Sequence, residues 1–103
     1  MQALLGLIEA QLAFETPSIG GKDSMSGTFN QLHVPPTLIT FAVTTAKSEQ
    51  IISPEFKKAG NYIYVIAHHP HADHTPDYTE LKSNFDKVRE LIRKGTIVSA
   101  ATV

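Results

Sequence analysis

The 103-residue chain contains no cysteine, and this absence excludes several classes of protein at once. Without a thiol there is no disulfide scaffold, no thiolate zinc finger and no cysteine nucleophile. The charges nearly cancel, at nine Lys and Arg against ten Asp and Glu, so no basic excess is present to grip the phosphates of a nucleic acid. We therefore predict no general nucleic-acid binding. The lack of cysteine also fits a reducing compartment, and we predict a cytoplasmic location.

Long hydrophobic runs are missing as well. The strongest apolar run, from Ala3 to Ile8, is broken by Glu9, far short of the roughly 20 residues that a membrane span needs. It has no basic region before it and no small-residue cleavage site, so it does not resemble a signal peptide. At 42% hydrophobic and 18% charged residues, the chain is too apolar for a disordered tail. We predict no membrane association, and one small domain or part of a larger one.

Both ends of the chain have sequence patterns typical of helices and strands that pack against further protein. Residues 2–14 predict a helix that is apolar nearly all round, which is typical of a helix buried among other elements. Residues 96–103 form an apolar, strand-like run with no polar tail. We expect a fragment of a longer polypeptide. The alternative is an inert interaction fragment whose ends, 2–14 and 96–103, drive self-association.

Periodicity along the chain predicts an α/β or α+β arrangement. Glycine, proline and serine punctuate the apolar segments, and period-two alternation with β-branched residues marks the strands. The expected elements after the first helix are a loop at 17–33, a strand at 37–45, a short helical turn at 53–56, a buried strand at 62–67, a His-rich loop at 68–74, a helix from Thr75 to Gly95, and a strand at 96–103.

The last helix has the clearest signals. Thr75 is expected to cap it, with Pro76 at the first helical position, and Gly95 to end it in the left-handed conformation. Glu90 and Lys94 are four residues apart in the favourable order for an ion pair. A single apolar stripe is expected from Leu81, Phe85, Val88, Leu91 and Ile92.

Four of the five histidines fall between His68 and His74. The pattern H-x-H-x-D-H, between a strand and a helix, resembles the zinc loop of metallo-β-lactamase-like hydrolases, and imidazoles with a carboxylate suit zinc. No histidine or cysteine follows, so a complete hydrolase site is not expected. A small metal-binding module remains an alternative. The competing interpretation is an exposed loop whose imidazoles are solvated or cap the following helix. The four candidate ligands are His69, His71, Asp73 and His74.

A second polar segment joins the adjacent glycines Gly20 and Gly21 to a lysine, an aspartate and hydroxyls. Such a segment can hold phosphate, and an aspartate can hold Mg²⁺ through its oxygens. It is not a Walker A loop, because Thr16 and Asp23 occupy the places of that motif's first glycine and its final hydroxyl residue. From composition alone, a glycine-rich turn with a solvated charge pair is the alternative.

Three sequence motifs, taken together, indicate more than this segment does alone. They are T-P-S-I-G-G-K-D-S-M-S-G-T-F at 16–29, V-P-P-T-L-I-T-F-A-V at 34–43 and I-S-P-E-F-K-K-A-G-N at 52–61. Read as a set, they resemble the phosphoribosylformylglycinamidine synthase family, the large ligases of purine biosynthesis. The resemblance covers most of residues 2–67 and is weaker beyond them.

The resemblance implies a fold and a parent activity. Residues 1–46 would be the end of an N-terminal subdomain, and residues 47–103 the start of a C-terminal subdomain, of an aminoimidazole ribonucleotide synthetase-like fold. The segment resembles the second of two such halves, which is thought to retain an auxiliary nucleotide. The parent enzyme converts formylglycinamide ribonucleotide, ATP and glutamine to formylglycinamidine ribonucleotide, ADP, phosphate and glutamate.

Residue by residue, the resemblance makes Asp23 a Mg²⁺ ligand at an ATP or ADP molecule. Lys22, Ser24 and Ser26 would lie near the phosphates. It assigns no catalytic residue here and no role to the His-rich loop. The glutaminase domain, most nucleotide ligands and the substrate pocket of the family lie outside these residues, so the piece is expected to lack synthase activity by itself. Its expected partner is the remainder of the parent synthase polypeptide.

Overall fold

A computed structural model of the chain describes residues 1–24 and 27–103. The chain divides into two compact units, Met1–Thr44 and Thr45–Val103, and each is described by itself. Over the described residues the elements are two α-helices, one 3-10 turn and two antiparallel strand pairs. This composition confirms the coarse α+β class. The particular synthetase-like fold and its two subdomains stay a prediction.

The first helix, α1, runs over Gln2–Phe14, as predicted. It begins after Met1 without any side-chain cap. It ends at Glu15, whose φ of 53° is left-handed, and the N–H groups of Glu15 and Thr16 return to carbonyls of the last turn at 3.3 and 3.1 Å. This is the Schellman geometry that normally uses glycine, here built on a glutamate.

The prediction of a loop over 17–33 is wrong. Strand β1, Gly20–Ser24, pairs antiparallel with β4, Thr37–Phe41, so the glycine-rich segment is part of a ladder. Glycine has a low strand propensity, so residues 20–24 by themselves do not predict a strand. They form one because they pair with β4, which contains β-branched residues. The strand predicted at 37–45 is confirmed over its first five residues and ends at Phe41.

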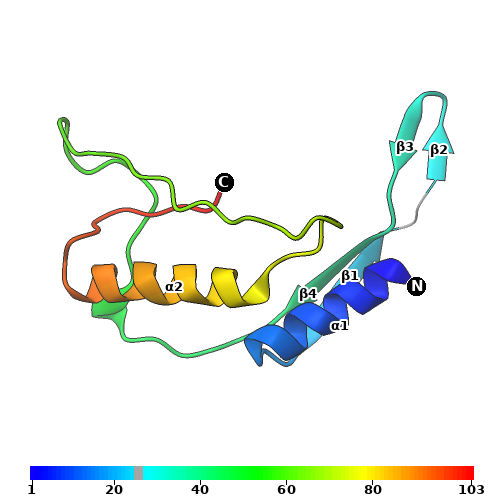
Figure 1. The fold of residues 1–103 in the computed structure, drawn as a ribbon, viewed down its shortest axis with the longest axis horizontal. Helices are drawn as coiled ribbons and strands as arrows, with labels where there is room; N and C mark the ends of the chain where they lie inside the picture. The colour runs from blue at the N-terminus through cyan, green and yellow to red at the C-terminus, as the bar shows by residue number, and fades with distance from the viewer. Residues whose placement is uncertain (25–26) are drawn as a thin grey trace. The chain divides into compact units, whose positions relative to one another are not determined.

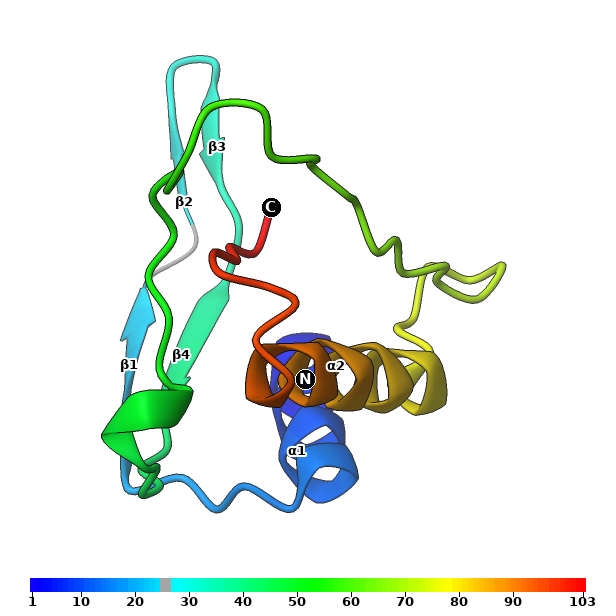
Figure 2. The same ribbon diagram turned by 90° about the vertical axis from the view of Figure 1, so that its left-hand side faces the viewer.

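A short hairpin lies between β1 and β4 in the sequence. Strand β2, Gly27–Phe29, pairs with β3, Leu32–Val34, through a two-residue connection in which Asn30 has a φ of 53°. Asparagine tolerates that conformation better than most residues, so it suits the tight turn. Figure 2 shows this hairpin extending beyond the β1–β4 pair.

Helix α1 lies against β4 in the first unit (Figure 1). The β1–β4 backbones approach so closely that a Cβ on Gly21 would lie 2.6 Å from the carbonyl oxygen of Ile39. Side-chain bonds at one end reinforce the pair, since the Thr40 hydroxyl donates to Ser18 Oγ and Ser18 Oγ donates to the Gly20 carbonyl, each at 2.6 Å. Gly21 is therefore a position where only hydrogen fits without moving the backbone.

The second unit contains the 3-10 turn η1, Ser48–Gln50, and the helix α2, Tyr78–Arg93. The predicted end of α2 is confirmed: Gly95 has a φ of 68°, and the N–H groups of Gly95 and Thr96 return to the carbonyls of Ile92 and Leu91. The predicted Glu90–Lys94 ion pair is also present, at 2.5 Å. The predicted start is wrong by two residues, because Asp77 rather than Thr75 is the cap.

Three further predicted elements are absent from the described residues. Residues 62–67 and 96–103 form no strand, and 53–56 forms a bend instead of a helical turn. The segment at 62–67 was expected to be buried, yet Tyr62 and Val65 are 87% and 78% exposed. A β-rich sequence becomes a strand only when a partner backbone completes its hydrogen bonds, and no described residue pairs with either segment.

Large apolar side chains are exposed in both units. No described residue is fully buried, and the predicted burial of α1 is wrong, since Leu5 is 52% and Leu12 is 73% exposed. Of the helices in the described part of the chain, none is long and apolar enough to cross a membrane.

Candidate functional site

The residues predicted to hold a nucleotide lie on strand β1, where alternation sets their directions. Cross-strand partners share a face, so Lys22 lies with Ile39 on one side of the sheet, and Asp23 lies with Leu38 on the other. Ser24 is two residues from Lys22 and shares its face. The structure therefore brings Lys22 and Ser24 together and places Asp23 on the opposite face. Ser26 lies outside the described residues.

Both charged side chains of this motif are exposed and available. All five residues of β1 are exposed. Neither Lys22 nor Asp23 takes part in an ion pair or a side-chain hydrogen bond with any described residue. In an exposed ion pair the two partners would partly neutralise each other, so their separation leaves a free ammonium and a free carboxylate.

The donor set suits a magnesium ion bound together with a phosphate, rather than a closed metal cage. Mg²⁺ usually keeps several waters and takes one or two carboxylates plus phosphate oxygens. Asp23 provides one such carboxylate on an open strand. A hollow of about 180 Å³ in the same unit lies at the other end of the sheet, beside Glu15 and Val43 and away from the motif.

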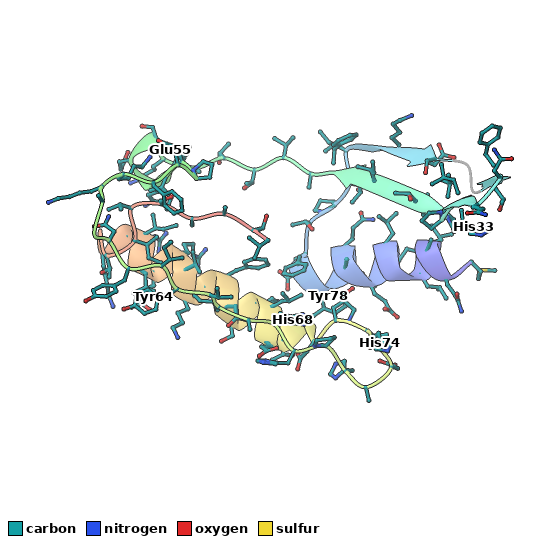
Figure 3. The ribbon with its side chains drawn as sticks, turned by 90° about the horizontal axis from the view of Figure 1, so that it is seen from above. His33, Glu55, Tyr64, His68, His74 and Tyr78 are labelled. Atoms are coloured by element: carbon teal, nitrogen blue, oxygen red, sulfur yellow. The ribbon has the colours of Figure 1, made fainter. Side chains whose placement is uncertain are left out.

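The His-rich loop leads into the start of α2, where Figure 3 labels His68, and the side chains of His68 and His69 both form hydrogen bonds there. The backbone N–H of His69 donates to Glu80 Oε2 at 2.6 Å, and His69 Nδ1 lies 2.8 Å from Glu80 Oε1. A carboxylate only accepts, so His69 donates from Nδ1. One carboxylate thus receives two hydrogen bonds from a single residue.

His68 completes the cap of the helix. Asp77 accepts from the Glu80 N–H at 3.0 Å, which is the first half of a capping box, and the Asp77 N–H donates to His68 Nε2 at 3.0 Å. In an ordinary capping box the glutamate at the third position would accept that second bond. Here the imidazole accepts it, so Glu80 is free to hold His69. The interpretation that the imidazoles cap the following helix is confirmed for His68.

The rest of the loop closes on itself. Asp73 Oδ1 accepts from both the N–H and the hydroxyl of Thr75, at 3.0 and 2.6 Å. The backbone N–H of His74 donates to the His71 carbonyl, and His74 has a left-handed φ of 67°. Asp73 and Thr75 therefore stabilise the turn by bonding to each other, and neither of them caps the helix. This explains why the cap lies two residues later than predicted.

The four predicted zinc ligands are not gathered. Among the described residues, which include the whole loop, no three His, Asp or Glu side chains lie close enough to hold a metal ion. Asp73 is occupied by Thr75, and His69 by Glu80. Figure 3 shows His74 on the loop away from His68, which is beside the helix. This geometry gives the metal-binding module no support.

The carboxylates of this region have lowered pKa values because they accept hydrogen bonds in the ionised state. The pKa of Glu80 is below its usual 4.5 owing to the His69 side chain first and the His69 N–H second. The pKa of Asp77 is below 3.8 owing to the Glu80 N–H, and that of Asp73 owing to the Thr75 hydroxyl. Asp73 is exposed, whereas Asp77 and Glu80 are half-buried, and in all three the hydrogen bonds outweigh the effect of burial, which would raise the pKa.

A separate polar cluster occupies the bend at 53–57. The Lys57 ammonium contacts both Glu55 and Ser53 Oγ, and the Ser53 hydroxyl donates to Glu55 Oε1 at 2.7 Å. Lys57 first and Ser53 second lower the pKa of Glu55 to about 2. Ser53 thus bonds side chains instead of capping a helix, which accounts for the missing helical turn.

Sequence reasoning missed Asp77 and Glu80 as the partners of the histidines. The signal was present, because Asp77-Tyr78-Thr79-Glu80 has the spacing of a capping box. It was obscured by Thr75-Pro76, which has an equally good start signal two residues earlier. Comparison with protein families, with curated proteins and with solved structures finds no match to this chain.

Proposed function

We propose that this chain is part of an ATP-dependent carbon–nitrogen ligase of the phosphoribosylformylglycinamidine synthase type. Its β1–β4 pair would carry part of a magnesium–nucleotide site. The three sequence motifs support the proposal. The structural observation that carries it is that Lys22 and Asp23 are exposed on a paired strand, with no ion pair or side-chain hydrogen bond to any described residue.

The alternation of β1 assigns two separate contacts. Lys22 and Ser24 share a face, so an ammonium and a hydroxyl can donate to one phosphate group. Asp23 is on the opposite face and is assigned to the cation. Mg²⁺, when bound, neutralises charge on phosphate oxygens. The chain's own residues hold and orient; none of them is assigned as a nucleophile or a general base.

In the parent reaction, the amide oxygen of formylglycinamide ribonucleotide receives a phosphoryl group from ATP. Ammonia released from glutamine then displaces that oxygen as phosphate. The proposed partners are therefore these substrates and the remaining polypeptide of a cytoplasmic synthase. The exposed apolar side chains of α1 and of residues 62–65 are the surfaces that this polypeptide would cover.

The test is a titration of the 103-residue chain with ADP, with and without Mg²⁺, followed by calorimetry or by protein NMR shifts. Lys22→Ala is expected to weaken binding in both conditions, and Asp23→Asn only when Mg²⁺ is present. Lys58→Ala and Glu49→Gln, which change charge in the other unit, are the matched controls. Binding that responds equally to these variants and to the controls would show that the nucleotide assignment is wrong.

A second function, self-association, is favoured by the exposure of apolar side chains. The predicted drivers were 2–14 and 96–103, and Leu12 and Val98 are indeed 73% and 45% exposed. Residues 62–65 add a third exposed apolar segment. Sedimentation velocity at two protein concentrations tests this function. A mean sedimentation coefficient that rises with concentration supports it, and an invariant monomer contradicts it.

A further inference from the structure

One face of α2 forms an apolar hollow that the proposed nucleotide site does not use. Phe85, Val88 and Ile92 are spaced three and four residues apart, so they share this face. Ala46 and Gln50 close the hollow from the segment that contains η1. Figure 1 shows η1 beside the C-terminal end of α2, within the same unit.

The size of the hollow limits what it accepts. Its volume is about 260 Å³. Pockets that enclose a cofactor or drug-sized ligand usually measure about 300–1,000 Å³, so this one is too small for a nucleotide. It suits a single large apolar side chain from another polypeptide, the kind of anchor that dominates many protein interfaces.

Charge at the edge of the hollow selects among such polypeptides. Arg89 and Arg93 both line it, one helical turn apart, and none of the described residues that line it is acidic. Arg89 has one exposed ion pair, to Asp86 at 3.1 Å, while Arg93 forms none with any described residue. An exposed pair of this kind contributes little, so both guanidinium groups are available to carboxylates.

We propose that this face of α2 docks an acidic segment of a partner protein that inserts one leucine or phenylalanine between Phe85, Val88 and Ile92. Carboxylates of the partner on either side of the anchor pair with Arg89 and Arg93. The guanidinium fork matches a carboxylate in two-bond geometry, which adds orientation to attraction. The apolar side chain provides the burial, and the charges determine which segments are accepted.

The probe is a synthetic peptide, acetyl-Glu-Glu-Leu-Phe-Glu-Glu-amide, titrated into the 103-residue chain and followed by NMR shifts. We expect saturable shifts at residues 85–93 and binding that weakens as salt is raised. The same peptide with lysine in place of glutamate is expected not to bind. Equal binding of both peptides, or no binding of either, would overturn the proposal.

Variants separate the arginine contacts from general charge. Arg89→Glu combined with Arg93→Glu is expected to weaken binding by roughly tenfold or more. Lys82→Glu combined with Lys87→Glu changes the net charge equally, but neither residue lines the hollow, so it is expected to change binding by less than about twofold. Circular dichroism of both double variants checks that α2 is retained. If the two pairs weaken binding equally, the hollow is not the docking site.

Discussion

The two units of the chain are held by different kinds of hydrogen bond. In Met1–Thr44 most of the order comes from backbone ladders, which join β1 to β4 and β2 to β3. In Thr45–Val103 no described strand forms, and the bonds run from side chains to the backbone around the start of α2. The β1–β4 ladder joins residues 13 to 21 positions apart, whereas the bonds around the start of α2 join residues 9 and 11 positions apart.

The two helices show the same contrast. Helix α1 has no side-chain cap and ends on a left-handed glutamate, whereas α2 has a capping aspartate and ends on a left-handed glycine. Each feature of α2 is the preferred residue for its position. Helix α1 instead relies on its contact with β4. A helix with good ends is specified locally, while one with poor ends depends on what it packs against.

The largest expected effect is in the first unit, at Gly21. In Gly21→Ala the new Cβ would lie 2.6 Å from the Ile39 carbonyl oxygen, so the backbones of β1 and β4 must separate. Overpacking of this kind costs about 1–3 kcal/mol. Hydrogen exchange of the β1–β4 amides should accelerate, while α2 stays unchanged. Gly20→Ala, where nothing lies within 4 Å, is the control. Equal effects at both glycines would contradict the close approach.

Acidification is expected to destabilise the second unit, Thr45–Val103, rather than the first. Asp77 and Glu80 have folded pKa values lowered by hydrogen bonds from the Glu80 N–H and from His69. Carboxyls with lowered folded pKa values stabilise the structure above their unfolded pKa, and this contribution is lost as the pH falls through the folded pKa. The first turn of α2 should therefore loosen below a pH of about 4.5.

NMR shifts recorded against pH measure this loss at residues 78–82. Asp77→Asn with Glu80→Gln should remove the acid-sensitive step, because neither side chain can then titrate. If the β1–β4 amides change before the first turn of α2 does, the assignment of acid sensitivity to the capping box is wrong.

A smaller effect is expected at the end of α2. Gly95→Ala places a Cβ at a φ of 68°, where a left-handed residue costs about 1–2 kcal/mol. The last turn of α2 should fray, as measured by amide exchange of residues 90–96. Gly6→Ala, within α1, should have the opposite sign and stabilise its helix by about 0.5–1 kcal/mol. A Gly95→Ala variant whose last turn does not fray would show that the Schellman geometry does not hold α2.

The smallest expected effect is at the corresponding end of α1. Glu15→Gly relieves a left-handed residue but makes the unfolded chain more flexible, so the net stabilisation is roughly 0.5 kcal/mol. The helical signal of α1 in chemical shifts should increase slightly. A decrease would mean that the Glu15 side chain itself contributes to the end of the helix. In that case the contrast between the two helices would be smaller than the backbone angles indicate.

Features marked by helical periodicity or by one residue type were predicted well, whereas strand pairing was not, including that of the local β2–β3 hairpin. The first helix, the strand from Thr37 and the glycine end of α2 were all predicted from periodicity or from a single residue type. β1 was missed because two glycines and a charge pair have no strand signal. The segments 62–67 and 96–103 were predicted as strands from their own composition, which cannot reveal that no described partner is aligned with them.

The same limit of sequence-based prediction applies to the two candidate sites. Sequence alone identified Lys22, Asp23 and Ser24 as neighbours, but the strand places Asp23 opposite the other two. It identified the histidines as a cluster, but the hydrogen bonds of Asp77 and Glu80 separate their roles. Adjacent residues in a strand point in opposite directions, so Asp23 is not expected to contact the same phosphate group as Lys22 and Ser24.

The sequence by itself predicted where both helices lie and determined the left-handed end of α2, because helical periodicity and the Gly95 signal act within a few residues. Only the tertiary structure decided which β-rich segments pair, which histidine side chains bond to the start of α2, and which face of β1 each candidate ligand occupies. Those outcomes depend on which backbone groups meet across the fold. A residue's identity does not specify its hydrogen-bond partner until the chain brings that partner within reach.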